Sequence, residues 1–142
     1  MAIDLEILPE VRWANFIDGL GAFDADDDGD IYQKQIGYFD ESRLDDDERC
    51  LFIKKESDNT VPGDFHEDVT ILMVFFSKTD KSDSINTNYF MTLMQNRLLC
   101  AKEGDDFFNC ESLGSAGPII LDSGRHAYEL RFRAMSNYHP TL

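Results

Sequence analysis

The chain has few of the residues that build disulfides or metal sites. Its three cysteines, Cys50, Cys100 and Cys110, are an odd number and show no CxxC spacing. Its three histidines match no zinc-ligand pattern. We therefore predict free thiols, as in a reducing cytoplasm, and no bound metal or other cofactor.

Positive charge is also scarce, because 13 Lys and Arg residues stand against 28 Asp and Glu residues, for a net charge of -15. Such a surface repels nucleic-acid phosphates and anionic membranes, which disfavours both as specific partners. No segment approaches the ~20 consecutive apolar residues that cross a bilayer. The start, MAIDLEILPE, is acidic, so we expect no signal peptide.

Catalytic signatures are missing as well. The sequence contains no GxSxG motif, and no phosphate-binding helix follows the Gly114 and Gly117 pair. Ser123 and His126 lie close together, but the order Asp122-Ser123-Gly124 is typical of a tight turn that leads into a strand. We predict no catalytic residue and a protein that is not an enzyme.

Apolar and aromatic residues, by contrast, are plentiful. Hydrophobic residues make up 42% of the chain, including 11 Phe, 5 Tyr and 1 Trp. This is enough to form one hydrophobic core, and the length suits a single domain. We predict one domain over residues 1–142, in which residues 1–3 and 136–142 are flexible ends or interface arms.

Helical periodicity appears in two segments. Apolar residues recur at steps of three and four over residues 9–20, where Pro9 suits the first helical position. A second stripe runs over residues 85–99, with Ser84 as the expected N-cap. We predict a helix at each segment.

Strand patterns occupy most of the rest. The run at residues 68–77 is apolar on both faces, which predicts a central strand with the helices on one side and a loop, water or a neighbouring subunit on the other. The acidic residues 40–49 are expected to be solvated. The predicted class is α+β, a mostly antiparallel sheet of four or five strands with two helices packed on one face. Its strands are expected at residues 50–56, 68–77, 107–113 and 126–135, with a short strand or turn at 31–39.

One acidic loop follows a calcium-binding pattern. Asp24, Asp26 and Asp28 occupy positions 1, 3 and 5 of an EF-hand loop, and Gly29 occupies position 6. Position 12 is Gln35 in place of the usual Glu, and no second such loop pairs with it. We favour an acidic surface turn, with structural calcium or a calcium sensor as the alternatives.

Arg131 and Arg133 are the candidate interface residues. They share one face of the alternating strand at 126–135, in a chain with few positive charges. They pair either with acids of the same chain or with an acidic loop of a neighbouring subunit, in which case they would orient the contact.

The segment from about Cys50 to Met135 resembles the tail-terminator, or tail-completion, proteins of long-tailed bacteriophages, the lambda-type minor tail proteins. The resemblance lies in an N-terminal helix, then CLFIKK, DVTILMVFF, SINTNYFMTLMQNRLL and GPIILDSGRHAYELRFRAM. The Gly117-Pro118 bend and the Gly124-Arg125 turn before the last strand are the most family-like elements.

The resemblance implies a structural virion protein that forms a hexameric ring. The ring would cap the finished tail tube, end its polymerisation and offer a surface for head attachment. Its partners would be further copies of itself, the tail tube protein and a head-completion or connector protein, and DNA would pass through the pore without specific binding. The location would be the head-proximal end of the tail, after assembly in the host cytoplasm. Two alternatives stay open: a head-completion or connector protein at the same junction, or a calcium-binding module that uses residues 24–35.

Overall fold

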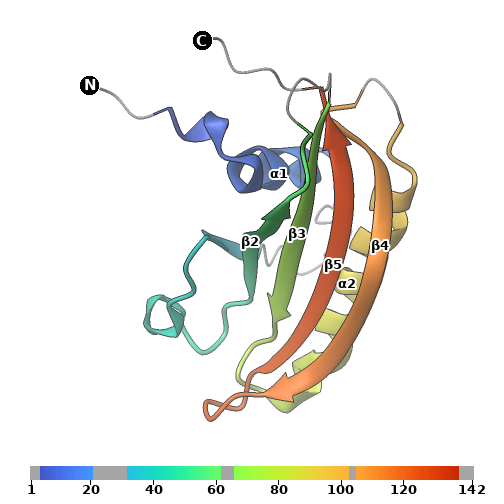
Figure 1. The fold of residues 1–142 in the computed structure, drawn as a ribbon. Coiled ribbons are helices and arrows are strands. Elements are labelled where there is room, and N and C mark those ends of the chain that lie inside the picture. Colours follow the sequence, from blue (N-terminus) through green and yellow to red (C-terminus); the bar gives the residue numbers. More distant parts are fainter. Residues whose placement is uncertain (1–3, 21–31, 62–65, 103–104, 138–142) are drawn as a thin grey trace.

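The computed structural model describes residues 4–20, 32–61, 66–102 and 105–137, and Figure 1 shows their arrangement. Each of the two α-helices is followed by a group of strands, as in an α+β fold. Within these ranges the elements are the 3-10 helices η1 (Leu5–Ile7), η3 (Glu41–Arg43) and η4 (Lys81–Asp83), the helices α1 (Pro9–Asp18) and α2 (Ser84–Leu99), and the strands β1 (Gln33–Ile36), β2 (Cys50–Asp58), β3 (Glu67–Phe76), β4 (Phe107–Ile120) and β5 (His126–Ser136).

The strands form one five-stranded sheet in the order β1-β2-β3-β5-β4. Strand β1 runs parallel to β2, and the other neighbouring pairs are antiparallel. The apolar run at residues 68–77 is indeed the central strand, β3, because β2 and β5 pair with it on its two sides. The predicted fold class, a mostly antiparallel sheet with two helices, is therefore confirmed.

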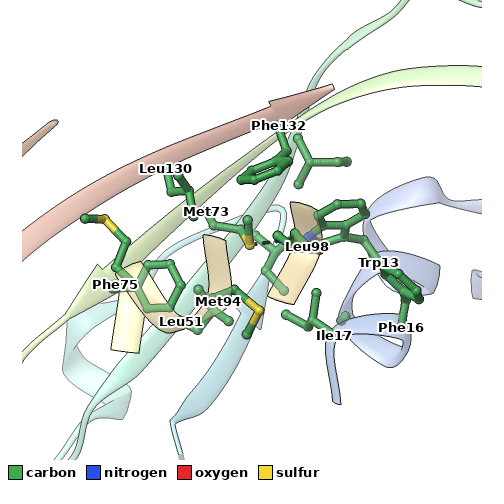
Figure 2. Close-up of a cluster of buried hydrophobic side chains, with 14 of the residues drawn as sticks. Trp13, Phe16, Ile17, Leu51, Met73, Phe75, Met94, Leu98, Leu130 and Phe132 are labelled. Carbon is green, nitrogen blue, oxygen red and sulfur yellow. Dashed lines mark hydrogen bonds between the residues drawn. The ribbon is translucent and has the colours of Figure 1, made fainter. Parts of the chain in front are cut away.

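Both helices pack on the same face of the sheet, and the main core lies between the two layers (Figure 2). Trp13 of α1 is fully buried there, and its indole N–H approaches the Met73 sulfur at 3.3 Å. Its ring also meets Phe107 edge-on, with centroids 5.0 Å apart. Complete burial of one such side chain contributes ~1.5–3 kcal/mol. Helix α1 is therefore held to the sheet chiefly by its apolar stripe.

Helix α2 begins differently from the prediction. Asp83, not Ser84, is the N-cap residue, and Ser84 is the first residue of the helix. Asp83 is buried and forms a two-pronged ion pair with Arg49, at 2.7 and 3.0 Å. It also accepts the Lys78 N–H at 3.0 Å. These bonds outcompete a side-chain cap, and they join the start of β2 to the start of α2.

The acidic stretch at 40–49 is not simply solvated, which corrects the prediction. The loop between β1 and β2 folds under the face of the sheet that the helices leave free. Phe39 stacks on Phe76 at 4.1 Å with nearly parallel rings, and Leu44 packs into the same small cluster. The second cover of β3 at this end is therefore a loop of the same chain.

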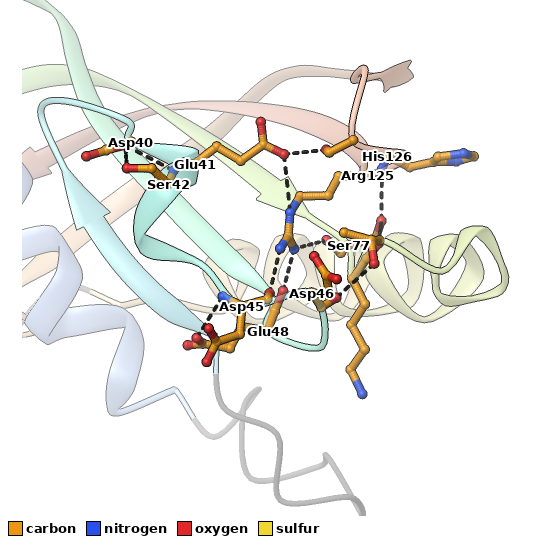
Figure 3. A network of polar contacts seen from close by, with 12 residues as sticks. Asp40, Glu41, Ser42, Asp45, Asp46, Glu48, Ser77, Arg125 and His126 are labelled. Atoms are coloured by element: carbon orange, nitrogen blue, oxygen red, sulfur yellow. Dashed lines mark hydrogen bonds and ion pairs between the residues drawn. The ribbon is translucent and has the colours of Figure 1, made fainter.

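Arg125 holds the loop between β1 and β2 against the sheet (Figure 3). Its buried guanidinium donates to the backbone oxygens of Asp45 at 2.6 Å, Glu48 at 2.5 Å and Ser77 at 2.8 Å. Glu41 lies 3.4 Å from its Nε. One arginine thus satisfies several buried carbonyls that an irregular loop would otherwise leave without partners.

Strand β4 is longer than predicted, because it continues through the expected Gly/Pro bend to Ile120. The bend is absorbed by register shifts between Phe108 and Glu111, Ser112 and Gly114, and Ala116 and Ile119. At Gly117, where φ is +137°, a Cβ would come within 2.8 Å of the Ala127 oxygen. Only glycine lets the two strands stay this close at that point.

Candidate functional site

The two predicted interface arginines lie on β5, on the face opposite the helices, and both are paired within the chain. Arg131 reaches Glu56 at 3.0 Å and Glu129 at 3.1 Å, and Arg133 reaches Asp68 at 2.8 Å. These are the intrachain partners that the sequence left as one alternative. A contact with a neighbouring subunit stays a prediction.

The serine and histidine that are close in sequence do not meet. Ser123 bonds instead to Glu41. His126 turns its Nδ1 to the Ser84 hydroxyl at 2.8 Å, and that hydroxyl also lies 2.7 Å from the Tyr128 hydroxyl. The sequence analysis missed this trio, since Ser84 and His126 are 42 positions apart. A hydrogen-bonded chain of this kind fixes the start of α2 on β5.

The calcium pattern falls mostly outside the described residues, since Asp24, Asp26 and Asp28 all lie in the range 21–31. Gln35, at position 12 of the pattern, is buried, and its side-chain oxygen accepts the Asp40 N–H at 2.6 Å. Its amide donates to the Asp40 oxygen at 3.0 Å. In the part of the chain that the structure describes, no group of three or more His, Cys, Asp or Glu side chains is arranged to hold a metal ion.

The cysteines are free thiols. Burial raises the pKa of Cys50 and of Cys110 to about 12, so both stay protonated at neutral pH. Nucleophilic and metal-binding chemistry needs the thiolate, which burial disfavours at both positions.

A hollow of about 370 Å³ opens between the end of α1 and the turn before β4, lined by Asn15, Phe16, Gly19, Leu20, Asp105 and Asp106. The Asp105 carboxylate already accepts the Lys102 N–H at 2.7 Å. The lining of the hollow is mixed, with Asn15, Asp105 and Asp106 beside the apolar Phe16 and Leu20.

Helix α2 and strand β4 together form an uncharged, partly apolar surface. In an acidic chain, residues 84–96 and residues 112–121 carry no charged side chain. The outward side of α2 exposes Ile85 (74%) and Tyr89, and the run 113–120 of β4 is exposed throughout. We call these residues together the neutral surface; its large apolar members are Ile85, Tyr89, Leu113, Ile119 and Ile120.

The two parts of the neutral surface lie close together. Helix α2 runs behind β4 and β5 (Figure 1). At its first turn Ser84 bonds to His126, whose cross-strand partner on β4 is Ile120. Ile85 and Ile120 therefore lie at the same end of the molecule. The lack of charge in both segments was visible in the sequence, but nothing local indicated that they would adjoin.

The outer edge of β4 adds a second property to this surface. Strand β4 is last in the sheet order, so its outer backbone groups have no partner strand among the described elements. A long unpaired edge is a template for pairing with another chain. The site is thus suited to binding a protein surface.

Comparison with known proteins finds no family model that matches the chain and no curated protein with significant sequence similarity. Within the described ranges, no helix combines the length and apolarity needed to cross a membrane. The fold and the neutral surface therefore carry the functional argument.

Proposed function

We propose that this chain is a structural subunit of a phage tail, a tail terminator whose copies form a ring. The observation that carries the proposal is the neutral surface beside the open β4 edge, in a chain whose net charge is -15. The ring caps the tail tube, ends its polymerisation and offers a surface to a head-completion or connector protein.

Electrostatics favours contact at the neutral surface. Identical acidic subunits repel each other over most of their surface, so they associate best where charge is missing. The buried centre of a protein interface is poor in charged residues and rich in apolar and aromatic ones. Ile85, Tyr89 and Ile120, all exposed, have this character.

The order of elements also supports the proposal. Helix α1, strands β2 and β3, helix α2 and strands β4 and β5 follow in the order that the tail-terminator resemblance implies, and the short strand β1 is added before β2. The free sheet face carries Glu56, Asp68 and Glu129, each paired with Arg131 or Arg133. A pore lined by acidic or neutralised groups would let DNA pass without binding it.

Native mass spectrometry of the full chain, together with negative-stain electron microscopy, tests ring formation. We expect one closed species, six copies by the resemblance, with a central hole and the same size in calcium and in chelator. A monomer at every concentration would contradict the proposal. A monomer that holds one calcium ion tightly would favour the calcium-binding module instead.

Capping is tested separately, with a purified phage tail tube protein. Tube polymerisation followed by light scattering should stop when the purified chain is added, and microscopy should place it at tube ends. Tubes that grow to normal length and bare ends would refute the capping role.

A further inference from the structure

A second uncharged, apolar site lies on the opposite edge of the sheet from the neutral surface. Strand β1 is the first strand in the sheet order and β4 is the last. Directly at the end of β1, Ile36 is exposed and Tyr38 is 77% exposed. We call residues 36–38 the β1 patch. Residues 35–39, which include it, carry no charge.

The other group of exposed apolar residues has a different setting. Leu5, Ile7 and Leu8 are exposed around η1, but Asp4, Glu6 and Glu10 alternate with them in the sequence. Carboxylates at that spacing would have to be desolvated in a contact, which is unfavourable. The β1 patch therefore suits an apolar contact better than the η1 group does.

The two neutral sites cannot meet within one molecule, because three strands separate β1 from β4. We propose that the neutral surface of one copy binds the β1 patch of the next copy. This inference rests on the proposed ring, and it names the two surfaces that form each junction. Tyr38 is the central side chain of the β1 patch in this junction. Ile85 and Ile120 of the neutral surface lie on either side of it.

This pairing gives the symmetry that a ring needs. A contact between two different surfaces of the same chain repeats head to tail, and it closes into a ring when the rotation allows. Pairing of two β4 edges across a two-fold axis would stop at a dimer and leave Tyr38 uncovered. The presence of two neutral sites, one at each edge, favours the head-to-tail contact.

Complementation of two interface variants tests the proposal. The first variant, Ile85→Asp with Ile120→Asp, places charge on the neutral surface, and the second, Tyr38→Asp, places it on the β1 patch. All three side chains are exposed, so both variants should fold, as circular dichroism and thermal melting will check. Each variant alone should sediment as a monomer, with at least a tenfold weaker association than the wild type.

An equal mixture of the two variants retains one intact junction, between the neutral surface of Tyr38→Asp and the β1 patch of the double variant. We expect a one-to-one heterodimer in analytical ultracentrifugation and no larger species. The matched control is Leu5→Asp, which alters an exposed apolar residue outside both sites and should leave rings intact.

A photo-crosslinker at position 38 gives an independent readout in the assembled wild-type background. Replacement of Tyr38 by p-benzoylphenylalanine should yield crosslinks to residues 84–96 or 112–121 of another copy, identified with isotope-labelled mixtures. Rings that survive Tyr38→Asp, or crosslinks to other segments, would overturn the proposed junction and leave the ring itself standing. A wild-type chain that forms no ring would refute the proposed function and the junction together.

Discussion

The two edges of the sheet are treated in opposite ways. At the β1 edge the added strand has only four residues, and helix α1 closes what remains. The Glu10 carboxylate accepts the Lys55 N–H of β2 at 3.2 Å, just beyond the last residue that β1 covers. Asp18, at the other end of α1, pairs with Lys34 of β1. At the β4 edge, a 14-residue strand has no further strand beside it among the described elements.

The difference shows how one chain can restrict where it associates. Natural sheets protect edges with short strands, charges, bulges or a covering helix. The β1 edge uses a short strand, charge and a helix, whereas β4 carries register irregularities and Pro118, which has no backbone N–H to offer another strand. Backbone pairing is thus less favourable at the short β1 edge than along the longer β4 edge.

The largest expected effect comes from removing the buried side chain that joins α1 to the sheet. Trp13→Ala should destabilise the protein by about 3–5 kcal/mol, because a fully buried indole is replaced by a cavity. Urea unfolding monitored by far-ultraviolet circular dichroism measures the loss. Ile85→Ala, an exposed position on the open side, is the control and should leave the unfolding midpoint of the monomer unchanged. Equal losses would contradict the division into a buried anchor and an exposed surface.

Next in size is the ion pair that links the β2 side to α2. Asp83→Asn should lower stability by about 3 kcal/mol, because it removes the charged carboxylate from a buried ion pair with Arg49. Urea titrations at neutral pH give this value. Arg133→Ala breaks an exposed pair on the free face and should change little.

The stability loss caused by Asp83→Asn should depend on pH. Burial alone raises the pKa of the Asp83 carboxyl, but hydrogen bonds from Arg49, the Lys78 N–H and Asn86 outweigh it and lower the pKa from its usual 3.8. A lowered folded-state pKa contributes stability above the unfolded value and loses it as the pH falls. The gap between wild type and Asp83→Asn should therefore be constant at neutral pH and narrow below about pH 3.8. A gap that widens in acid would contradict this account.

On the open edge, two glycines form a matched pair. Gly117→Ala should destabilise the protein by about 1–3 kcal/mol, since it adds a clash with the Ala127 oxygen to an unfavourable φ. Gly114→Ala also meets a positive φ, but its Cβ would have open space. In thermal unfolding, Gly117→Ala should have a clearly lower melting temperature than Gly114→Ala. Equal melting temperatures would mean that close approach of β4 and β5 is not what requires Gly117.

The smallest expected change comes from the contact between α1 and the edge of β2 beyond β1. Glu10→Gln keeps the shape of the side chain but removes the negative charge of the carboxylate that accepts the Lys55 N–H. We expect the free energy of unfolding to fall by about 1 kcal/mol. Hydrogen exchange should show faster exchange of the Lys55 amide, while amides on β4 keep their rates. Unchanged protection of Lys55 would show that Glu10 does not seal this edge.

Much of the fold followed from patterns that act over a few residues. A run that is apolar on both faces identified β3, alternation identified β5, and steps of three and four identified both helices. The same patterns failed at residues 107–120, where a Gly-Pro sequence indicated a bend but pairing with β5 keeps the strand continuous. They also failed at residues 40–49, where acidic composition concealed Leu44 and Arg49, which tertiary packing buries fully or in part. The neutral surface was readable as two uncharged segments but not as one surface.

The helices, the central strand, the acidity of the chain and the uncharged segments depend on composition and on neighbours along the chain, so the amino-acid order is enough to specify them. Which distant residues meet depends on the packing of the whole chain. Glu10 bonds Lys55 across 45 positions, and Ser84 bonds His126 across 42. Such contacts depend on how the helices cross the sheet, which the joint packing of the apolar core sets. The closed edge, the open edge and the neutral surface between α2 and β4 all arise at that level.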